Sequence, residues 1–144
     1  MNKNQNIFSV MNAMMFSGVD RDTENGVKLV NASLFCMGGE KLGITTHLFG
    51  NNQFGSCQVC SPIRTIQEVY GGYVFVTRSY NKYCVSKKDF KPVDKDSISV
   101  LTYELGDWLG GNKILRVFDS NFDKNDIPLF EGKPTEFEKQ FYGC

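Results

Sequence analysis

Short alternating runs of apolar and polar residues begin at residue 27 and predict β-strands. Residues 27–37 are β-branched and apolar on both faces, and residues 41–49 follow after a Gly-Gly-Glu turn. In this second run, side chains at every other position from Leu42 to Leu48 share one face, as the two-residue period of a strand requires. The pattern therefore predicts two strands joined by a turn.

The clearest local signal lies between residues 63 and 86. Two strand-like runs flank Gly71 and Gly72, and this pair permits the positive φ angles of a tight primed turn. A second polar turn at residues 79–82 is followed by another apolar run at 83–86. We therefore expect a three-stranded meander in this part of the chain.

Helical spacing is found in three places. Residues 5–16 bring isoleucine and methionine side chains near one face, which predicts a short helix. Residues 98–109 are ambiguous, because their leucine spacing favours a helix whereas Ser, Ile, Val, Thr and Tyr favour a strand over the first half. Thr135 with Glu138 three positions later is a capping box, which predicts a short C-terminal helix. Between the last two, residues 112–119 predict a strand.

These elements predict an α+β fold that occupies residues 1–144 as a single compact domain. Its main component is an antiparallel, meandering β-sheet, accompanied by two or three short helices. The short strands and tight turns between residues 58 and 86 are also compatible with a small SH3-like barrel. Because a fold does not determine a function, the function has to be argued from particular residues.

Charge is unevenly spread along a chain whose formal net charge is zero. Residues 64–93 hold six basic and two acidic side chains, a net charge of +4, and residues 94–144 hold six basic and ten acidic, a net charge of −4. A nucleic-acid-binding protein usually has a basic total, so the composition makes no strong case for duplex nucleic acid.

The compartment is predicted from what the sequence does not contain. The first residues lack the layout of a secretory signal, and no run approaches the roughly 18 apolar residues of a membrane span. The chain has five cysteines, an odd number that would leave one unpaired in a secreted domain. We therefore expect a cytoplasmic protein with reduced thiols and no membrane association.

Cys57 and Cys60 form a C-x2-C pair immediately before a serine and a proline. Such a pair is half of a typical zinc site, and the second half is not present as a motif. A zinc site would have to be completed by folding, from Cys84 with Cys36 or His47. The alternatives are a redox pair, or thiols packed in or beside the core as small apolar groups.

His47 is the single histidine of the chain, so mechanisms that need two histidines are excluded. It is a candidate general base for a small enzyme of unrecognised type, but no paired nucleophile is adjacent in sequence. No G-x-S-x-G motif and no phosphate-binding glycine motif occurs. The sequence favours a strand histidine whose ring nitrogens are hydrogen-bonded, and a protein that is not an enzyme.

Aromatic and cationic residues are interleaved between residues 70 and 91. Aromatic rings stack on bases and cations bind phosphates, so this segment is a candidate site for a small anionic, nucleotide-like ligand. On a strand, however, alternate aromatic residues mostly face the core. The predicted ligand-binding residues are Arg78, Tyr80, Lys82, Tyr83, Lys87 and Lys88.

The sequence therefore predicts a non-enzymatic binding or inhibitory protein without a cofactor. In composition, the chain resembles small accessory proteins of phages and mobile elements, many of which bind and block a host factor or sequester a signalling nucleotide. This resemblance implies a host protein or a small nucleotide-like ligand as partner. A zinc-stabilised interaction domain and a small enzyme remain the alternatives, and self-association stays open.

Overall fold

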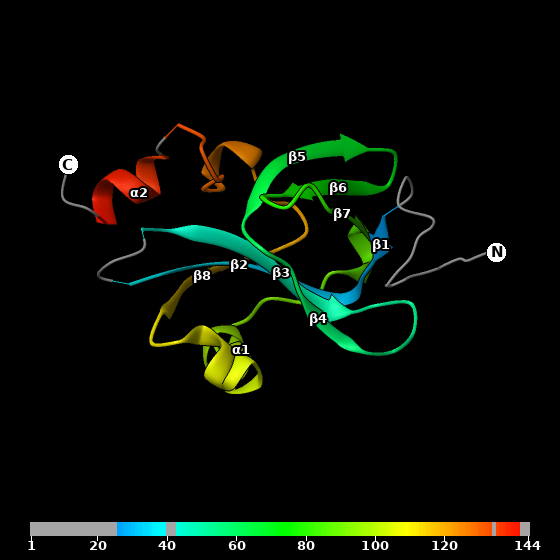
Figure 1. Cartoon of the computed structure of the whole chain (residues 1–144), viewed down its shortest axis with the longest axis horizontal. Coiled ribbons are helices and arrows are strands. Elements are labelled where there is room, and N and C mark those ends of the chain that lie inside the picture. The colour runs from blue at the N-terminus through cyan, green and yellow to red at the C-terminus, as the bar shows by residue number, and fades with distance from the viewer. Residues whose placement is uncertain (1–25, 40–42, 134, 142–144) are drawn as a thin grey trace.

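The strands of this protein form two four-stranded sheets that pack against each other (Figure 1). The computed structural model describes residues 26–39, 43–133 and 135–141. Sheet A contains, in spatial order, β1 (Val27–Lys28), β7 (Lys82–Ser86), β6 (Gly72–Thr77) and β5 (Ile63–Val69). Sheet B contains β4 (Cys57–Val59), β3 (Thr45–Asn51), β2 (Val30–Gly38) and β8 (Lys113–Phe118).

The expected α+β class with mainly antiparallel sheets is confirmed. Among the strand pairs of the described residues, β1 and β7 run parallel, and the other named pairs are antiparallel. The SH3-like barrel is not formed, because the strands separate into two open sheets with β1, β5, β4 and β8 at their edges. The expected meander is present as β5, β6 and β7.

The main core lies between the two sheets. Sheet B contributes Leu34 and Leu48, and sheet A contributes Ile63, Phe75 and Val85, each 2% exposed or less. Each such side chain stabilises the fold by roughly 1.5–3 kcal/mol through removal of apolar surface from water. Packing of the two inner faces is therefore what joins the sheets.

A helix covers the outer face of sheet B. α1 (Ser97–Leu105) continues into the 3-10 helix η4 (Gly106–Leu109), so the helical reading of this ambiguous segment is confirmed. Leu101, Leu105 and Leu109 pack with Phe35 and Ile114 in a second core cluster. In a helix the four-residue spacing places the three leucines near one face, and this face packs on sheet B.

The predicted C-terminal capping box is also present. The backbone N–H of Thr135 donates to Glu138 Oε1 at 3.0 Å, and the N–H of Glu138 donates to Thr135 Oγ1 at 3.1 Å. These bonds begin α2 (Glu136–Phe141). The helix predicted at residues 5–16 lies outside the described residues. No helix of the described residues is long and apolar enough to span a bilayer.

The turn between β5 and β6 differs from the primed type that we expected. Tyr70 and Gly71 are its central residues, since Val69 pairs with Gly72. Only Gly71 has a positive φ, +77°, whereas a primed turn needs one at the first central position. Gly72 is required for a different reason, because a Cβ atom there would lie 2.5 Å from the carbonyl oxygen of Val85 on β7.

We predict that Gly72→Ala destabilises the protein by about 1–3 kcal/mol, because the added methyl forces β6 away from β7. Tyr70→Ala in the same turn is the matched control, since Tyr70 is fully exposed. Its effect should stay within about 0.5 kcal/mol. The measurement is the free energy of unfolding in urea, and equal values for the two variants would contradict the close contact.

Candidate functional site

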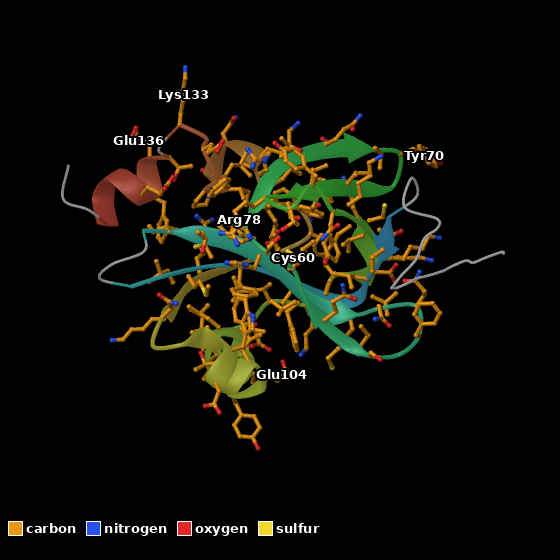
Figure 2. All side chains as sticks on the ribbon, viewed as in Figure 1. Cys60, Tyr70, Arg78, Glu104, Lys133 and Glu136 are labelled. Carbon is orange, nitrogen blue, oxygen red and sulfur yellow. The ribbon has the colours of Figure 1, made fainter. Side chains whose placement is uncertain are left out.

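An arginine–aromatic cluster lies where the first residues of β5 meet the turn between β6 and β7. We call it the Arg64 cluster. Arg64 lies near the start of β5, Arg78 and Tyr80 lie in the turn after β6, and Phe130 and Glu131 follow the 3-10 helix η5 (Lys124–Asp126). In Figure 2, Arg78 and Tyr70 mark opposite ends of the β5–β6 hairpin.

The guanidinium group of Arg64 lies over two aromatic rings. Its central carbon lies 4.8 Å from the ring centroid of Tyr80 and 5.0 Å from that of Phe130. Arg78 also lies over the Phe130 ring, at 5.9 Å. Nη1 of Arg64 donates to Glu131 Oε2 at 2.9 Å, and Nη2 donates to the backbone carbonyl of Arg78 at 3.4 Å.

Two residues of the cluster have an uncommon backbone conformation. Tyr80 has a φ of 63° and Glu131 a φ of 64°, and Asn31 is the only other non-glycine residue of the described chain with a positive φ. This conformation is sterically unfavourable for a bulky side chain and persists only where the surroundings impose it. Both residues contact Arg64, so the strain is concentrated at one site.

Backbone hydrogen bonds to neighbouring segments hold the cluster in place. The N–H of Arg78 donates to the carbonyl of Pro62 at 2.7 Å, and the N–H of Phe130 donates to the carbonyl of Ile63 at 2.8 Å. The Phe130 segment is anchored further by Thr46, whose hydroxyl donates to the carbonyl of Pro128 at 2.6 Å in the core. These bonds hold the two segments that carry the rings next to the start of β5.

The donor capacity of Arg64 is incompletely used. Its Nε atom is buried and has no hydrogen-bond partner among the described residues. In the part of the chain that the structure describes, the Glu131 carboxylate has one hydrogen bond, from Arg64, and the Glu131 side chain is 63% exposed. Two guanidinium groups face one carboxylate here, so the cluster has a local charge of +1. This arrangement favours a further acidic group, or one that replaces Glu131.

The six predicted ligand-binding residues are divided by the fold. Arg78 and Tyr80 belong to the Arg64 cluster, whereas Lys87 and Lys88 lie in the 3-10 helix η3 (Lys87–Asp89) at the opposite end of β7. Lys82 is exposed at the start of that strand. Because the Arg64 cluster and η3 lie at opposite ends of β7, the structure does not gather these cations on one surface.

Tyr83 is part of the core. It is 5% exposed, and its hydroxyl accepts a hydrogen bond from Gln58 Nε2 at 3.1 Å. Burial raises the pKa of Tyr83 to about 12. Strand alternation explains this placement, because Tyr83 faces sheet B while its neighbour Lys82 is exposed. Its ring is therefore not available at the surface of this structure.

Sequence reasoning missed Arg64, Phe130 and Glu131. Arg64 and Glu131 are separated by 67 positions, and no motif spacing links them. They meet because the segment after η5 returns to β5. The only local signal was Arg64 itself, the single cation of this strand.

The C-x2-C pair is split between surface and core. Cys57 is exposed on β4, whereas Cys60 is 2% exposed and its sulfur accepts the backbone N–H of Leu48 at 3.1 Å. Burial raises the pKa of Cys60, and likewise of Cys36, to about 12. Cys84 is half-buried, and burial raises its pKa too. Within the described chain, no three His, Cys, Asp or Glu side chains are placed to hold a metal ion.

His47 is a buried strand histidine with both ring nitrogens hydrogen-bonded, as the sequence favoured. Nδ1 lies 2.9 Å from the Cys60 carbonyl, which can only accept, so Nδ1 carries the proton. Nε2 then accepts from the hydroxyl of Thr45 at 2.8 Å. The ring stacks on Phe35 and meets Trp108 edge-on, with centroid separations of 5.7 and 5.2 Å. These contacts make His47 a structural link between β3 and η4.

A small hollow lies beside α1. Its volume is about 80 Å³, and its lining includes Val93, Val100 and the ion pair between Lys91 and Glu104, whose Nζ and Oε1 atoms are 3.4 Å apart. Pockets for small molecules usually measure roughly 300–1,000 Å³. The hollow is therefore too small to enclose a nucleotide.

No protein-family model, curated protein or solved structure matches this chain. The Arg64 cluster therefore has to be interpreted from its own geometry.

We predict that acid destabilises the protein through His47. Burial lowers the pKa of His47 from 6.5, and the positive charge of Arg78 acts in the same direction, against the hydrogen bond to Cys60. The unfolded chain therefore takes up a proton more readily than the folded chain as the pH falls below about 6.5. The free energy of unfolding should decrease by up to about 1.4 kcal/mol between pH 7.5 and 5.5.

The control for this measurement is His47→Gln, which keeps a donor and an acceptor and does not titrate. Since His47 is the single histidine, the decrease should be absent in this variant. An equal decrease in both proteins would assign the acid sensitivity to other groups. The unfolding transition is followed by the fluorescence of Trp108, the single tryptophan.

We also predict unequal thiol reactivity. Cys57 should react with a thiol-specific reagent in the folded protein, whereas Cys36 and Cys60 should react only after unfolding, because burial disfavours their reactive thiolates. Mass spectrometry of proteolytic peptides identifies each modified residue. Rapid modification of Cys60 in the folded protein would contradict its buried position.

Proposed function

We propose that this protein is a non-enzymatic binding protein and that the Arg64 cluster binds an acidic group on the surface of a partner protein. The observation that carries the proposal is the guanidinium of Arg64, which lies over the rings of Tyr80 and Phe130 and donates a hydrogen bond to the exposed carboxylate of Glu131.

The chemistry of arginine supports this choice of ligand. A guanidinium is planar, permanently charged and able to form two parallel hydrogen bonds to a carboxylate or phosphate. Its flexible side chain normally loses conformational entropy when it binds. Here the two rings already fix its orientation, so less entropy remains to be lost on binding.

Glu131 acts in this proposal as an internal stand-in for the ligand. Its carboxylate marks the position that an acidic group of the partner takes, and its exposure allows it to leave. The Arg64 side chain is 21% exposed and that of Glu131 is 63% exposed, so exchanging Glu131 for another carboxylate keeps the less exposed guanidinium paired.

The exposure of the Arg64 cluster favours the surface of a protein as its ligand over a small molecule that would have to be enclosed. Tyr80 is 72% exposed, and its ring is at the rim of the cluster. Tyrosine and arginine are the residues that most often dominate the binding energy of protein interfaces. An inhibitory role in the cytoplasm, like that of the accessory proteins that the chain resembles in composition, follows if the acidic group belongs to a functional surface of a host protein.

We predict opposite effects of two substitutions on binding of a fluorescent oligoglutamate peptide at low salt. Glu131→Gln should strengthen binding by about two- to fivefold, because it removes the internal competitor. Arg64→Lys should weaken binding, because lysine keeps the charge and loses the planar fork. Fluorescence anisotropy measures both effects.

Glu104→Gln is the matched control, because it also removes an exposed carboxylate with a cationic partner, Lys91. An equal gain in this variant would show that only overall charge matters. Unchanged binding by Arg64→Lys would show that the Arg64 cluster does not bind the peptide. If ATP binds instead of the peptide with the same dependence on Arg64, the ligand is a nucleotide and the acidic protein is excluded.

A further inference from the structure

Within residues 26–39, 43–133 and 135–141, β5 is an edge strand, and no other strand pairs with its outer side. It is the last strand of sheet A, next to β6 only, and Figure 1 shows it as the outermost strand at the top of the molecule. Beyond the irregularity between Ile63 and Thr65, the register continues without interruption to Val69. This run contains no lysine and no proline, the residues that commonly protect exposed edges.

The register shows which backbone groups point outward. Thr77 on β6 donates its N–H within the turn toward β7, and successive residues of a strand alternate in direction, so the preceding residue, Val76, directs its backbone groups toward β5. Thr65 lies directly opposite Val76, so it directs its own backbone groups toward β6. Ile66 and Glu68 therefore direct their N–H and C=O groups to the open side. In the described chain, neither has a backbone partner there.

The same edge already binds one segment of the chain. The carbonyl of Ile63 accepts the N–H of Phe130, and the residues that follow this bond occupy the Arg64 cluster with a ring and a carboxylate. A backbone hydrogen bond on the β5 edge is thus combined with an acidic side chain on Arg64. An incoming peptide can repeat this combination further along the strand.

We infer that the open edge of β5 binds an extended peptide segment of the partner, which adds a strand to sheet A and places an acidic side chain on the Arg64 cluster. The inference rests on the proposed function and specifies the form of the partner. Backbone hydrogen bonds to Ile66 and Glu68 supply affinity, and the contact with Arg64 supplies specificity, as in other cases of strand addition. The exposed side chains of Thr65, Gln67 and Val69 border the added strand.

The test selects binding peptides from a random library displayed on phage, with the full chain as the target. The enriched peptides are then measured against two variants substituted at position 68. Glu68→Pro removes the outward N–H, and proline is tolerated at such a position of an edge strand. Glu68→Ala is the matched control, because it also loses the carboxylate that lies 3.8 Å from Lys87 Nζ and keeps the N–H. Enriched peptides should share one acidic position. They should bind Glu68→Ala like the native chain and Glu68→Pro about tenfold more weakly.

Equal binding to the two variants, together with loss of binding to Arg64→Lys, would overturn strand addition and leave the proposed function intact. If the enriched peptides bind Arg64→Lys as tightly as the native chain, the result would contradict the proposed function itself. Failure to enrich any peptide would overturn the inference, and the oligoglutamate measurement would then decide the proposed function separately.

Hydrogen exchange on the native chain gives a second readout that does not depend on folding of the proline variant. The amides of Ile66 and Glu68 should exchange rapidly in the free protein and become protected when an enriched peptide is added. Unchanged exchange at both amides in the presence of bound peptide would overturn the inference.

Discussion

β2 is buried on both faces, and the other elements are arranged around this constraint. Leu34 and Cys36 face sheet A, whereas Phe35 between them faces α1. A strand with two covered faces must be apolar at consecutive positions rather than at alternate ones. Sheet B is therefore the middle layer of three. If either cover were lost, apolar surface of β2 would be exposed to water.

The buried polar groups of this layered structure serve its assembly. His47 joins β3 to the Cys60 backbone and, through its ring, to Trp108 of η4. Thr46, on the opposite face of β3, bonds the carbonyl of Pro128 and so attaches the segment that carries Phe130. A polar group buried without a partner would be strongly unfavourable, so these bonds fix where the connecting segments lie.

The Arg64 cluster depends on this rigid support. Its rings come from a turn and from an irregular segment, two kinds of structure that are usually mobile. Here both are bonded to the start of β5 or to the residue before it, and one is anchored in the core. The unfavourable backbone conformations of Tyr80 and Glu131 are maintained by this framework. The cluster and the open edge of β5 are adjacent parts of one strand, so recognition of an acidic group and of an extended backbone can be combined.

The local elements could be predicted from the sequence, because each depends on neighbours within a few positions. The alternation in β6 and β7, the leucine spacing of α1 and the capping pair of Thr135 and Glu138 are examples, and the mainly antiparallel α+β class follows from them. Whether residues 97–109 form a helix or a strand was left open, because residue propensity and leucine spacing disagree until a sheet face is present. Packing of the folded chain set three features that could not be predicted in this way: the division into two sheets, the parallel pairing of β1 with β7 and the strand β4. It also separated Lys87 from Arg78, buried Tyr83 and brought Glu131 to Arg64. These outcomes depend on contacts between residues that are distant in sequence. Such contacts are set by burial of complementary surfaces, and the spacing of residues within one element does not specify which other element it packs against.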